Sequence, residues 1–210
     1  MPNPGEVFLL ETPLPGETSG GAHLSVALSP AAFSQTNGFS LIAPLRSASP
    51  NAYRIQVRQD EFFPQGLGRP LDRARIIDLS QVTGIADVAL GPVMGTVADR
   101  PLNIVLDRIP RQFQIGLPPW LRRGQVWRTQ NGSEGVLIAN DTTLGQARQV
   151  YHMCVPYASG PLTAPIVMLS AHDRIAQVGM LTDGEQAVLD QQLIRAFGLE
   201  ASSFLRVTQK

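Results

Sequence analysis

Hydrophobic positions along this chain fall into short runs that end at turn-forming residues. Seventeen prolines and nineteen glycines are spread through its 210 residues. Runs this short between such breaks are typical of β-strands, whereas helices need longer amphipathic stretches. Many short strands predict a mainly β fold with few helices, built as small barrels or a sandwich. The runs are residues 7–10, 26–28, 39–43, 76–79, 135–139, 153–155 and 165–169.

Two segments carry helix signals instead. Thr182 and Glu185 are spaced as a capping box, in which each side chain bonds to the backbone amide of the other residue. Gly198 is placed to end this helix. A counterpart in the first half is expected over residues 102–109, where Pro101 suits a first-turn position. The apolar positions that follow the capping box at helical spacing are Leu189, Leu193 and Phe197.

Four segments of the first half recur in the same order in the second half. Their residue numbers differ by 119 at the first pair, by 112 at the third and by 101 at the last, so shorter loops are expected in the second copy. An internal duplication is the preferred interpretation, and one larger β domain with coincidental similarity is the alternative. The pairs are residues 5–8 with 124–127, 24–29 with 135–140, 41–47 with 153–159, and Asp72-Arg73 with Asp173-Arg174.

This repeat divides the chain into two domains. Residues 1–109 are expected to form one small barrel, and residues 124–210 a second, degenerate barrel with a C-terminal helix. Residues 110–123 would be the linker, because Pro110, Pro118 and Pro119 favour an extended connection.

Composition narrows the choice of partners and compartment. Seventeen basic and seventeen acidic residues balance, so a nucleic-acid site would have to be a local patch. The single cysteine, Cys154, excludes an intrachain disulfide and a cysteine-rich zinc site. No apolar run approaches the roughly 18 residues that span a bilayer, and residues 1–11 lack the features of a signal peptide. A soluble, cytoplasmic protein without a metal or another cofactor is expected.

Several motifs of the first half occur together in a known family of bacterial toxins. Gly-Glu-Val-Phe stands at residues 5–8, and a glycine-rich loop follows at residues 13–21. One strand ends in Ser29-Pro30, the next ends in Pro-Leu-Arg-Ser at residues 44–47, and Asp-Arg-Ala-Arg-Ile-Ile-Asp stands at residues 72–78. In this order and spacing the chain resembles the MazF/PemK (Kid-type) family from about residue 4 to residue 78.

The resemblance implies a fold, an activity and an assembly. The fold is an SH3-like barrel with a C-terminal helix, and the activity is cleavage of single-stranded RNA without a metal. Family members act as homodimers with RNA in a groove across the interface, and a protein antitoxin is the implied partner. Two tandem units could supply that arrangement within one chain, as a monomeric pseudo-dimer, or the chain could pair again as a homodimer.

Five positions make up the expected catalytic set. Metal-free RNA cleavage needs a base for the 2′-hydroxyl, a cation for the phosphate and an acid for the leaving oxygen. His23 stands where the resemblance expects an arginine; histidine can act as acid or base but grips phosphate less firmly. Arg46 stands where a small hydroxyl residue is expected. Ser47, Asp72 and the nearby basic residue Arg69 complete the set.

Each of these positions also has a structural interpretation. His23 would then be a loop histidine, and Arg46 a surface charge on a turn. Asp72 has arginines on both sides, which should lower its pKa and suits a structural ion pair at least as well as a general base.

RNA contacts are expected from residues around this set. Glu17 occupies the loop in which PemK-type proteins carry a histidine, although a solvated loop acid is the alternative. Arg54, Arg73 and Arg75 belong to a local basic group, and a second group follows. Gathered on one face, the two groups would form an electrostatic track for RNA; scattered, they are ordinary surface charges. The second group comprises Arg108, Arg111, Arg122, Arg123 and Arg128.

The sequence leaves two functions open. One is a metal-independent endoribonuclease toxin, and the other is a catalytically inactive relative that binds nucleic acid or a partner protein. In the second half, Ser159 and Asp173 are retained from the catalytic pattern, whereas His152 and His172 are expected to be core or surface histidines.

Overall fold

The chain divides into two compact units, Met1–Ile109 and Pro110–Lys210, and each is described by itself. The computed structural model describes residues 2–11, 22–50, 53–113, 124–137, 151–156, 167–170 and 174–199. Strands dominate both units, so the predicted mainly β fold is confirmed.

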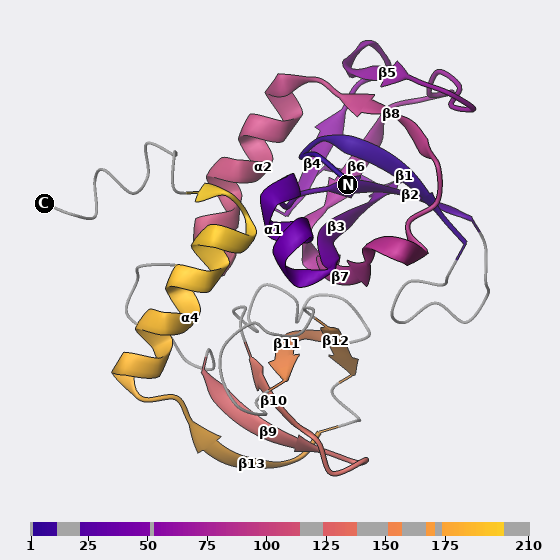
Figure 1. The fold of residues 1–210 in the computed structure, drawn as a ribbon. Coiled ribbons are helices and arrows are strands. Elements are labelled where there is room, and N and C mark those ends of the chain that lie inside the picture. Colours follow the sequence, from indigo (N-terminus) through magenta and orange to yellow (C-terminus); the bar gives the residue numbers. More distant parts are fainter. Residues whose placement is uncertain are drawn as a thin grey trace, which may run out of the picture. The chain divides into compact units, whose positions relative to one another are not determined.

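The first unit is built on one antiparallel sheet. Its strand order is β4-β6-β3-β2-β1-β8-β5, and β7 also pairs with β3. Figure 1 shows that this sheet curls into a nearly closed barrel. The strands are β1 (Glu6–Leu10), β2 (His23–Ala27), β3 (Phe39–Arg46), β4 (Arg54–Val57), β5 (Phe62–Pro64), β6 (Arg75–Asp78), β7 (Thr83–Ala86) and β8 (Val93–Val97).

Two α-helices and three short 3₁₀ turns accompany these strands. The turns η1 (Gln59–Glu61), η2 (Leu79–Gln81) and η3 (Asp87–Ala89) lie at strand ends. Helix α1 (Ala31–Asn37) connects β2 to β3, and helix α2 (Asp99–Gln112) follows β8.

Strand β3 is buried along nearly its whole length. Strand β2 flanks one of its edges, while β6 and β7 share the other. A strand covered on both faces has a near-continuous apolar run, which is why the sequence identifies it. Its buried hydroxyl, Ser40, donates to Asp87 Oδ1 at 2.6 Å and therefore accepts from Ser34 Oγ at 2.7 Å. This chain of hydrogen bonds ties α1 and η3 to β3.

The second unit has a five-stranded antiparallel sheet followed by a helix. Its strand order is β12-β11-β10-β9-β13. The predicted capping box is confirmed: Thr182 N donates to Glu185 Oε2 at 2.8 Å, and Glu185 N donates to Thr182 Oγ1 at 3.3 Å. The elements are β9 (Gln125–Thr129), β10 (Glu134–Leu137), β11 (Tyr151–Pro156), β12 (Val167–Ser170), β13 (Arg174–Met180) and α4 (Asp183–Ala196).

The predicted extended linker is wrong at its start. Helix α2 confirms the expected helix around residues 102–109 but continues to Gln112, with Pro110 inside it. Proline lacks an amide hydrogen and so loses the bond to the carbonyl four residues earlier, and only two residues of the helix follow it. Phe113 follows the helix and packs against Phe197, with ring centroids 5.0 Å apart. Residues 114–123 lie outside the described residues.

Each of the two sheets contains a row of paired residues, and the two rows match. Each row crosses four neighbouring strands in the same order and is antiparallel at every step. Where β8 pairs with β1, and where β13 pairs with β9, the register shifts and skips one residue. The skipped residue is Met94 in β8 and Val178 in β13. The rows are Gly95, Val7, Val26, Ala43 in the first unit and Gly179, Val126, Val136, Val155 in the second.

The backbone on either side of this row also agrees between the units. Gly5 and Gly124 precede β1 and β9 with positive φ angles of 89° and 84°. Their carbonyls accept from Val97 N and Leu181 N, at 2.9 Å in both cases. The helices that follow, α2 and α4, have 14 residues each.

One segment of the first unit is far longer than the connection at the same place in the second. Ala43 in β3 is joined to the start of β7 by residues 44–82, whereas the equivalent Val155 in β11 is joined to the start of β12 by residues 156–166 alone. We call residues 44–82 the extra segment; it holds β4, η1, β5, β6 and η2. From β7 onward, equivalent residues differ by 84 in number, as Gly95 and Gly179 do.

Two of the sequence pairings need correction. Asp173-Arg174 is not the counterpart of Asp72-Arg73, because Arg174 begins β13, which is equivalent to β8, whereas Asp72-Arg73 precedes β6. A repeated dipeptide carries no information on strand register. The pairing of residues 24–29 with 135–140 is one residue out, since Val26 corresponds to Val136.

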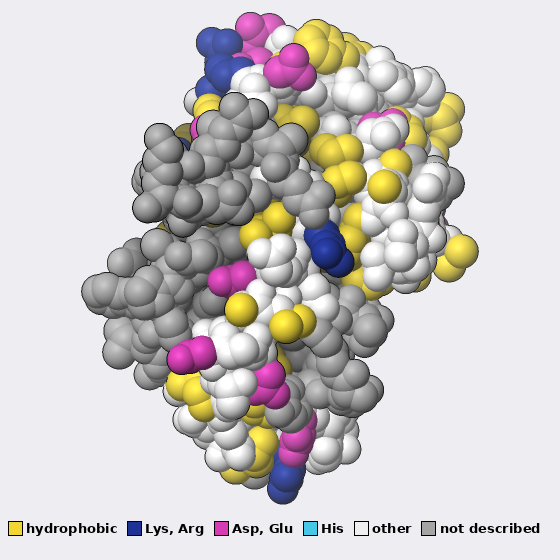
Figure 2. Space-filling model, turned by 60° about the vertical axis from the view of Figure 1, so that its left-hand side comes forward, with side chains coloured by type: hydrophobic (Ala, Val, Ile, Leu, Met, Phe, Trp, Pro, Cys, Tyr) yellow, Lys and Arg dark blue, Asp and Glu magenta, His cyan; other side chains and the backbone are white. Residues whose placement is uncertain are grey.

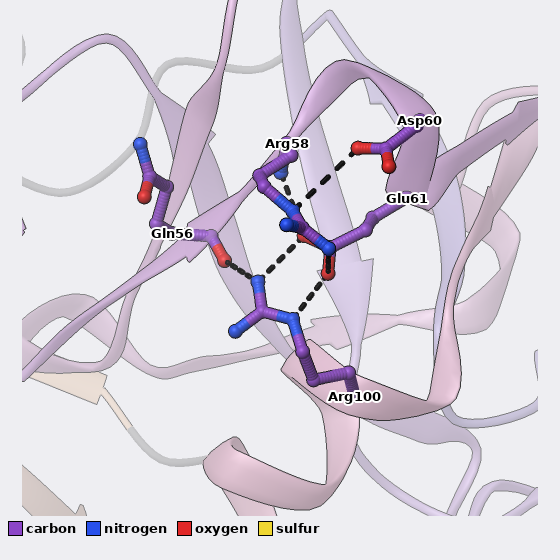
Figure 3. Close-up of polar contacts among 5 residues, drawn as sticks. All are labelled: Gln56, Arg58, Asp60, Glu61 and Arg100. Atoms are coloured by element: carbon purple, nitrogen blue, oxygen red, sulfur yellow. Dashed lines mark hydrogen bonds and ion pairs between the residues drawn. The ribbon is translucent and has the colours of Figure 1, made fainter.

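A buried carboxylate joins η1 to α2 (Figure 3). Arg100 donates from Nε and Nη2 to the two oxygens of Glu61, and Nη2 also reaches Gln56 O at 3.2 Å. Arg58 adds a backbone bond of 2.8 Å and a side-chain bond of 3.1 Å to the same carboxylate. Arg100 foremost, then Arg58, lowers the pKa of Glu61 to about 2 against the cost of burial.

We expect Glu61→Gln to lower the free energy of unfolding by about 2 kcal/mol at pH 7, because the neutral amide leaves Arg100 without its charged partner. The folded-state pKa lies below the ordinary value of 4.5, so the carboxylate stabilises the fold fully above about pH 4.5. The difference between the two proteins should shrink as the pH falls from 5 toward 2. Urea unfolding followed by circular dichroism measures it. Asp60→Asn, an exposed charge in the same turn, is the control and should cost under about 0.5 kcal/mol.

Gly95 and Gly179 should respond differently to alanine, although they are equivalent in the two sheets. A Cβ at Gly95 would lie 2.5 Å from Phe62 Cζ and 2.5 Å from Phe63 O, whereas at Gly179 it would meet only Val126, at 3.8 Å. Gly95→Ala should therefore destabilise the protein by about 1–3 kcal/mol, and Gly179→Ala should change stability by less than about 0.5 kcal/mol. Equal effects in urea unfolding would contradict the described packing.

Candidate nucleic-acid interface

Ser47, Asp72 and Arg75 meet at one end of β3 and β6. The pairing of Leu45 with Ile77 and of Arg46 with Ile76 brings the residue after β3 beside the first residue of β6. Arg75 donates from Nη1 to Ser47 Oγ at 2.5 Å and from Nη2 to Asp72 Oδ1 at 2.8 Å. One guanidinium therefore bridges a hydroxyl and a carboxylate that lie far apart in the sequence.

The Asp72 carboxylate is open to solvent but held in its ionised form. Its side chain is 67% exposed, and Arg73 Nε lies 3.9 Å from Oδ2. The hydrogen bond from Arg75 lowers the pKa of Asp72 below its ordinary value, and the charges of Arg75 and Arg73 act in the same direction. The predicted lowering is confirmed, but its main source is Arg75 and not Arg69. Arg69 is exposed and makes no hydrogen bond or ion pair with another residue of the described ranges.

The loop that carries Asp72 is anchored by its backbone. Gln59 Nε2 donates to Leu71 O at 3.1 Å and to Asp72 O at 3.0 Å. Gln59 begins η1, the turn that also contains Glu61. Turn η1 thus links the two sites, because it contains both Gln59, which holds the Asp72 loop, and Glu61, which pairs with Arg100. Sequence reasoning missed Gln59, because a glutamine that binds two carbonyls of a distant loop has no local pattern.

His23 and Arg46 lie on the opposite face of the sheet from Ser47. Side chains alternate between faces along a strand, so Arg46 points away from the face of Leu45. The pairing of Leu45 with Ile77 places Arg75, which bonds to Ser47, on the face of Leu45. The pairing of Ser25 with Pro44 places His23 on the face of Arg46, at the same end of the two strands. The structure therefore brings together Ser47 and Asp72 of the expected catalytic set and separates them from His23 and Arg46.

Arg54 is engaged in the fold itself. Its Nε donates to Asp78 Oδ2 at 3.2 Å, and the side chain of Asp78 is almost fully buried. Asp78 also accepts from Ser80 N at 3.1 Å and from Ser80 Oγ at 2.5 Å. Glu17 lies outside the described residues, as do Ser159, His172 and the side chain of His152.

Several charged side chains on the surface are paired with one of opposite sign. Arg58 contacts Asp60 and Glu61, and Arg128 contacts Glu134 at 2.8 Å. On the face drawn in Figure 2, the Lys and Arg side chains form small separate groups, the upper and lower ones next to acidic side chains. The group around Arg75 remains the best local candidate.

The cluster of Ser47, Asp72, Arg73 and Arg75, which we call the Arg75 cluster, has the chemistry of an anion site. Two guanidiniums outnumber one carboxylate, and a hydroxyl lies within the same network. Arginine donors match the oxygens of a phosphate group. Within the described ranges, no group of three or more His, Cys, Asp or Glu side chains is placed to hold a metal ion, and none of the described helices is long and apolar enough to cross a membrane.

Comparisons with known proteins give similarity at the level of structure alone. No family model and no curated protein match the sequence. A chain of the MazE–MazF crystal structure from Deinococcus radiodurans is similar with 19% identity and a TM-score of 0.39, over 52% of this chain and 93% of that one. MazF from the same organism gives 20% and 0.38, over 53% and 94%. An endoribonuclease bound to its cognate antitoxin, from a mycobacterial species, gives 15% and 0.34, over 56% and 96%. Similarity this remote carries no argument about function.

Removing the bridging cation should raise the pKa of Asp72. We expect Arg75→Gln to move the Asp72 carboxyl toward its ordinary pKa of 3.8, because the strongest hydrogen bond to the carboxylate is lost. Arg73→Gln makes the same change in charge at 3.9 Å and should give a smaller rise. An NMR titration of the Asp72 carboxyl carbon in both variants and in the unaltered protein measures the three pKa values. A larger rise of this pKa in Arg73→Gln than in Arg75→Gln would refute the described geometry.

Proposed function

We propose that this chain is a MazF/PemK-like protein of the toxin family whose first unit binds single-stranded RNA through the Arg75 cluster. The observation that carries the proposal is the guanidinium of Arg75, which holds Ser47 and Asp72 together at an open end of the sheet. Arg73 adds a second cation beside it. Cations that track phosphates and tolerate any base are the usual means of holding a single strand.

Binding without efficient cleavage fits the protonation state of Asp72. A general base works best when its pKa lies near the working pH, and the arginines move the pKa of this carboxyl in the other direction. His23 and Arg46 lie on the other face of the sheet, so they are poorly placed to supply the missing acid, base or second phosphate contact.

A metal-independent endoribonuclease is the second candidate. The observation in its favour is the exposure of the Asp72 carboxylate beside a cation and a hydroxyl. These groups could serve a reaction that proceeds through a 2′,3′-cyclic phosphate, at a rate limited by the weak base. The sequence resemblance that suggests this activity also suggests a protein antitoxin as partner.

We further propose that the two units arose by duplication of one barrel. Strand order, register, the skipped residue and helix length support it. The Arg75 cluster lies within the extra segment, so under this proposal only the first unit carries an RNA site.

The two candidate functions predict opposite effects of Asp72→Asn. If the cluster only binds, loss of a negative charge beside the phosphate should tighten binding of a labelled single-stranded RNA, about two- to fivefold at low salt. If it cleaves, the unaltered protein should release fragments with cyclic phosphate ends in EDTA, and Asp72→Asn should abolish them. Gel shift and fragment analysis on the full chain measure both.

Arg75→Ala completes this experiment. It should weaken RNA binding and reduce the slope of log affinity against log salt by about 0.7, the amount for one phosphate contact on a single strand. Arg128→Ala removes a surface cation of the second unit and is the matched control, with affinity unchanged. A protein that neither binds nor cleaves RNA would eliminate both candidates.

A further inference from the structure

Strand β13 forms an open edge of the second unit's sheet. It pairs with β9 on one side and stands last in the strand order. Residues 176–180 are all exposed, including the apolar side chains of Val178 (40%) and Met180 (52%). Within the described residues of this unit, no strand pairs with the outer edge of β13.

The equivalent strand of the first unit is covered. Strand β5 pairs antiparallel with the outer edge of β8, with Phe63 opposite Thr96 and Pro64 opposite Gly95. Gln65 N adds a bond of 3.0 Å to Met94 O, the carbonyl of the residue skipped in the register. Strand β5 belongs to the extra segment, and none of the described strands of the second unit takes its place.

A glycine marks the slot that β5 fills. The Phe62 ring lies so close to Gly95 that a Cβ there would be 2.5 Å from Cζ. A glycine inside a strand often marks such a close approach. Among the described residues, a Cβ added at the equivalent Gly179 would have only the Val126 side chain within 4 Å. The second unit therefore keeps the glycine while no described residue takes the place of Phe62.

The second unit has its own partner for the backbone amide that directly precedes the helix. In the first unit, Ala98 N donates to Glu61 O at 2.8 Å just before α2. The equivalent Thr182 N donates to the carboxylate of Glu185, within the capping box of α4. The helix start is thus satisfied without a covering strand, and only the strand edge is left open.

The sequence of β13 lacks the usual protection of such an edge. Natural proteins guard exposed strand edges with charged residues, prolines or a covering element. Arg174 at the first position is the only charged residue of β13, and the strand has no proline. An apolar edge of this kind is suited to pairing with another strand.

We propose that the outer edge of β13 binds an extended peptide segment of another protein, which adds a strand antiparallel to β13 and places an aromatic side chain over Gly179. Main-chain bonds to the strand supply affinity, and the slot over the glycine supplies selectivity for the aromatic residue. Strand β5 on β8 is the template for this arrangement within the same chain. The proposal is independent of RNA binding by the first unit.

The test uses the full chain and a fluorescein-labelled peptide with the sequence of residues 59–67, which contains β5. Fluorescence anisotropy should show saturable binding. Replacing the first phenylalanine of the peptide with alanine should weaken binding at least tenfold. Gly179→Val should do the same, because its methyl groups fill the slot; the site has room for a Cβ, so the variant should fold. Gly184→Val adds the same side chain at an open position of α4 and should leave binding unchanged.

Three outcomes would overturn the proposal. One is no binding at about 1 mM peptide, the limit of weak association. The second is peptide binding that Gly179→Val does not affect, which would place the peptide elsewhere. The third is a dimer in sedimentation velocity that Gly179→Val dissociates, which would assign the edge to a second copy of this chain. RNA binding should be unaltered in Gly179→Val, so failure here is distinguishable from failure of the proposed RNA site.

Discussion

The ion pair between Glu61 and Arg100 holds the part of the first unit in which the candidate interface lies. Arg100 projects from the first turn of α2, and Glu61 closes η1. The same turn holds the Asp72 loop through Gln59, and Asp72 in turn meets Arg75. A buried carboxylate of this kind is costly unless fully paired, and here four hydrogen bonds from two arginines satisfy it. The exposed Arg75 cluster is therefore connected, through Gln59, to the buried contacts of Glu61 with Arg100 and Arg58.

The described residues of the second unit lack that support. The position equivalent to Arg100 is Gly184, by the constant difference of 84 that relates the two C-terminal parts, and the stretch that holds Glu61 has no counterpart among the described residues of the second unit. Helix α4 nevertheless starts at the equivalent residue and has the same length as α2, because the capping box satisfies its first amides. The helix and the row of paired residues occur in both units, whereas Glu61, Arg58 and the Arg75 cluster lie in the extra segment.

Sequence reasoning recovered the elements with strong local signals. Strand β3 has a continuous apolar run because both its faces are covered, and Thr182 and Glu185 mark the start of α4 directly. Strand β5 was missed because a very short strand ending in proline carries no periodicity, and β7 contains a glycine. Helix α1 was missed because it is short, with no acidic residue in its first turn. The role of Arg75 depends on a contact with Ser47 from a different strand, which no local pattern encodes.

The length difference between the units has a consequence for how their surfaces differ. The extra segment carries both a cationic cluster and the strand that seals a sheet edge. In the proposed duplication, a single contiguous deletion would remove both. The unit that lost the cationic cluster would then also expose a sheet edge that can pair with another strand. Under these proposals, one unit would hold anions and the other would pair with a strand, without any substitution in the row of residues that both sheets contain.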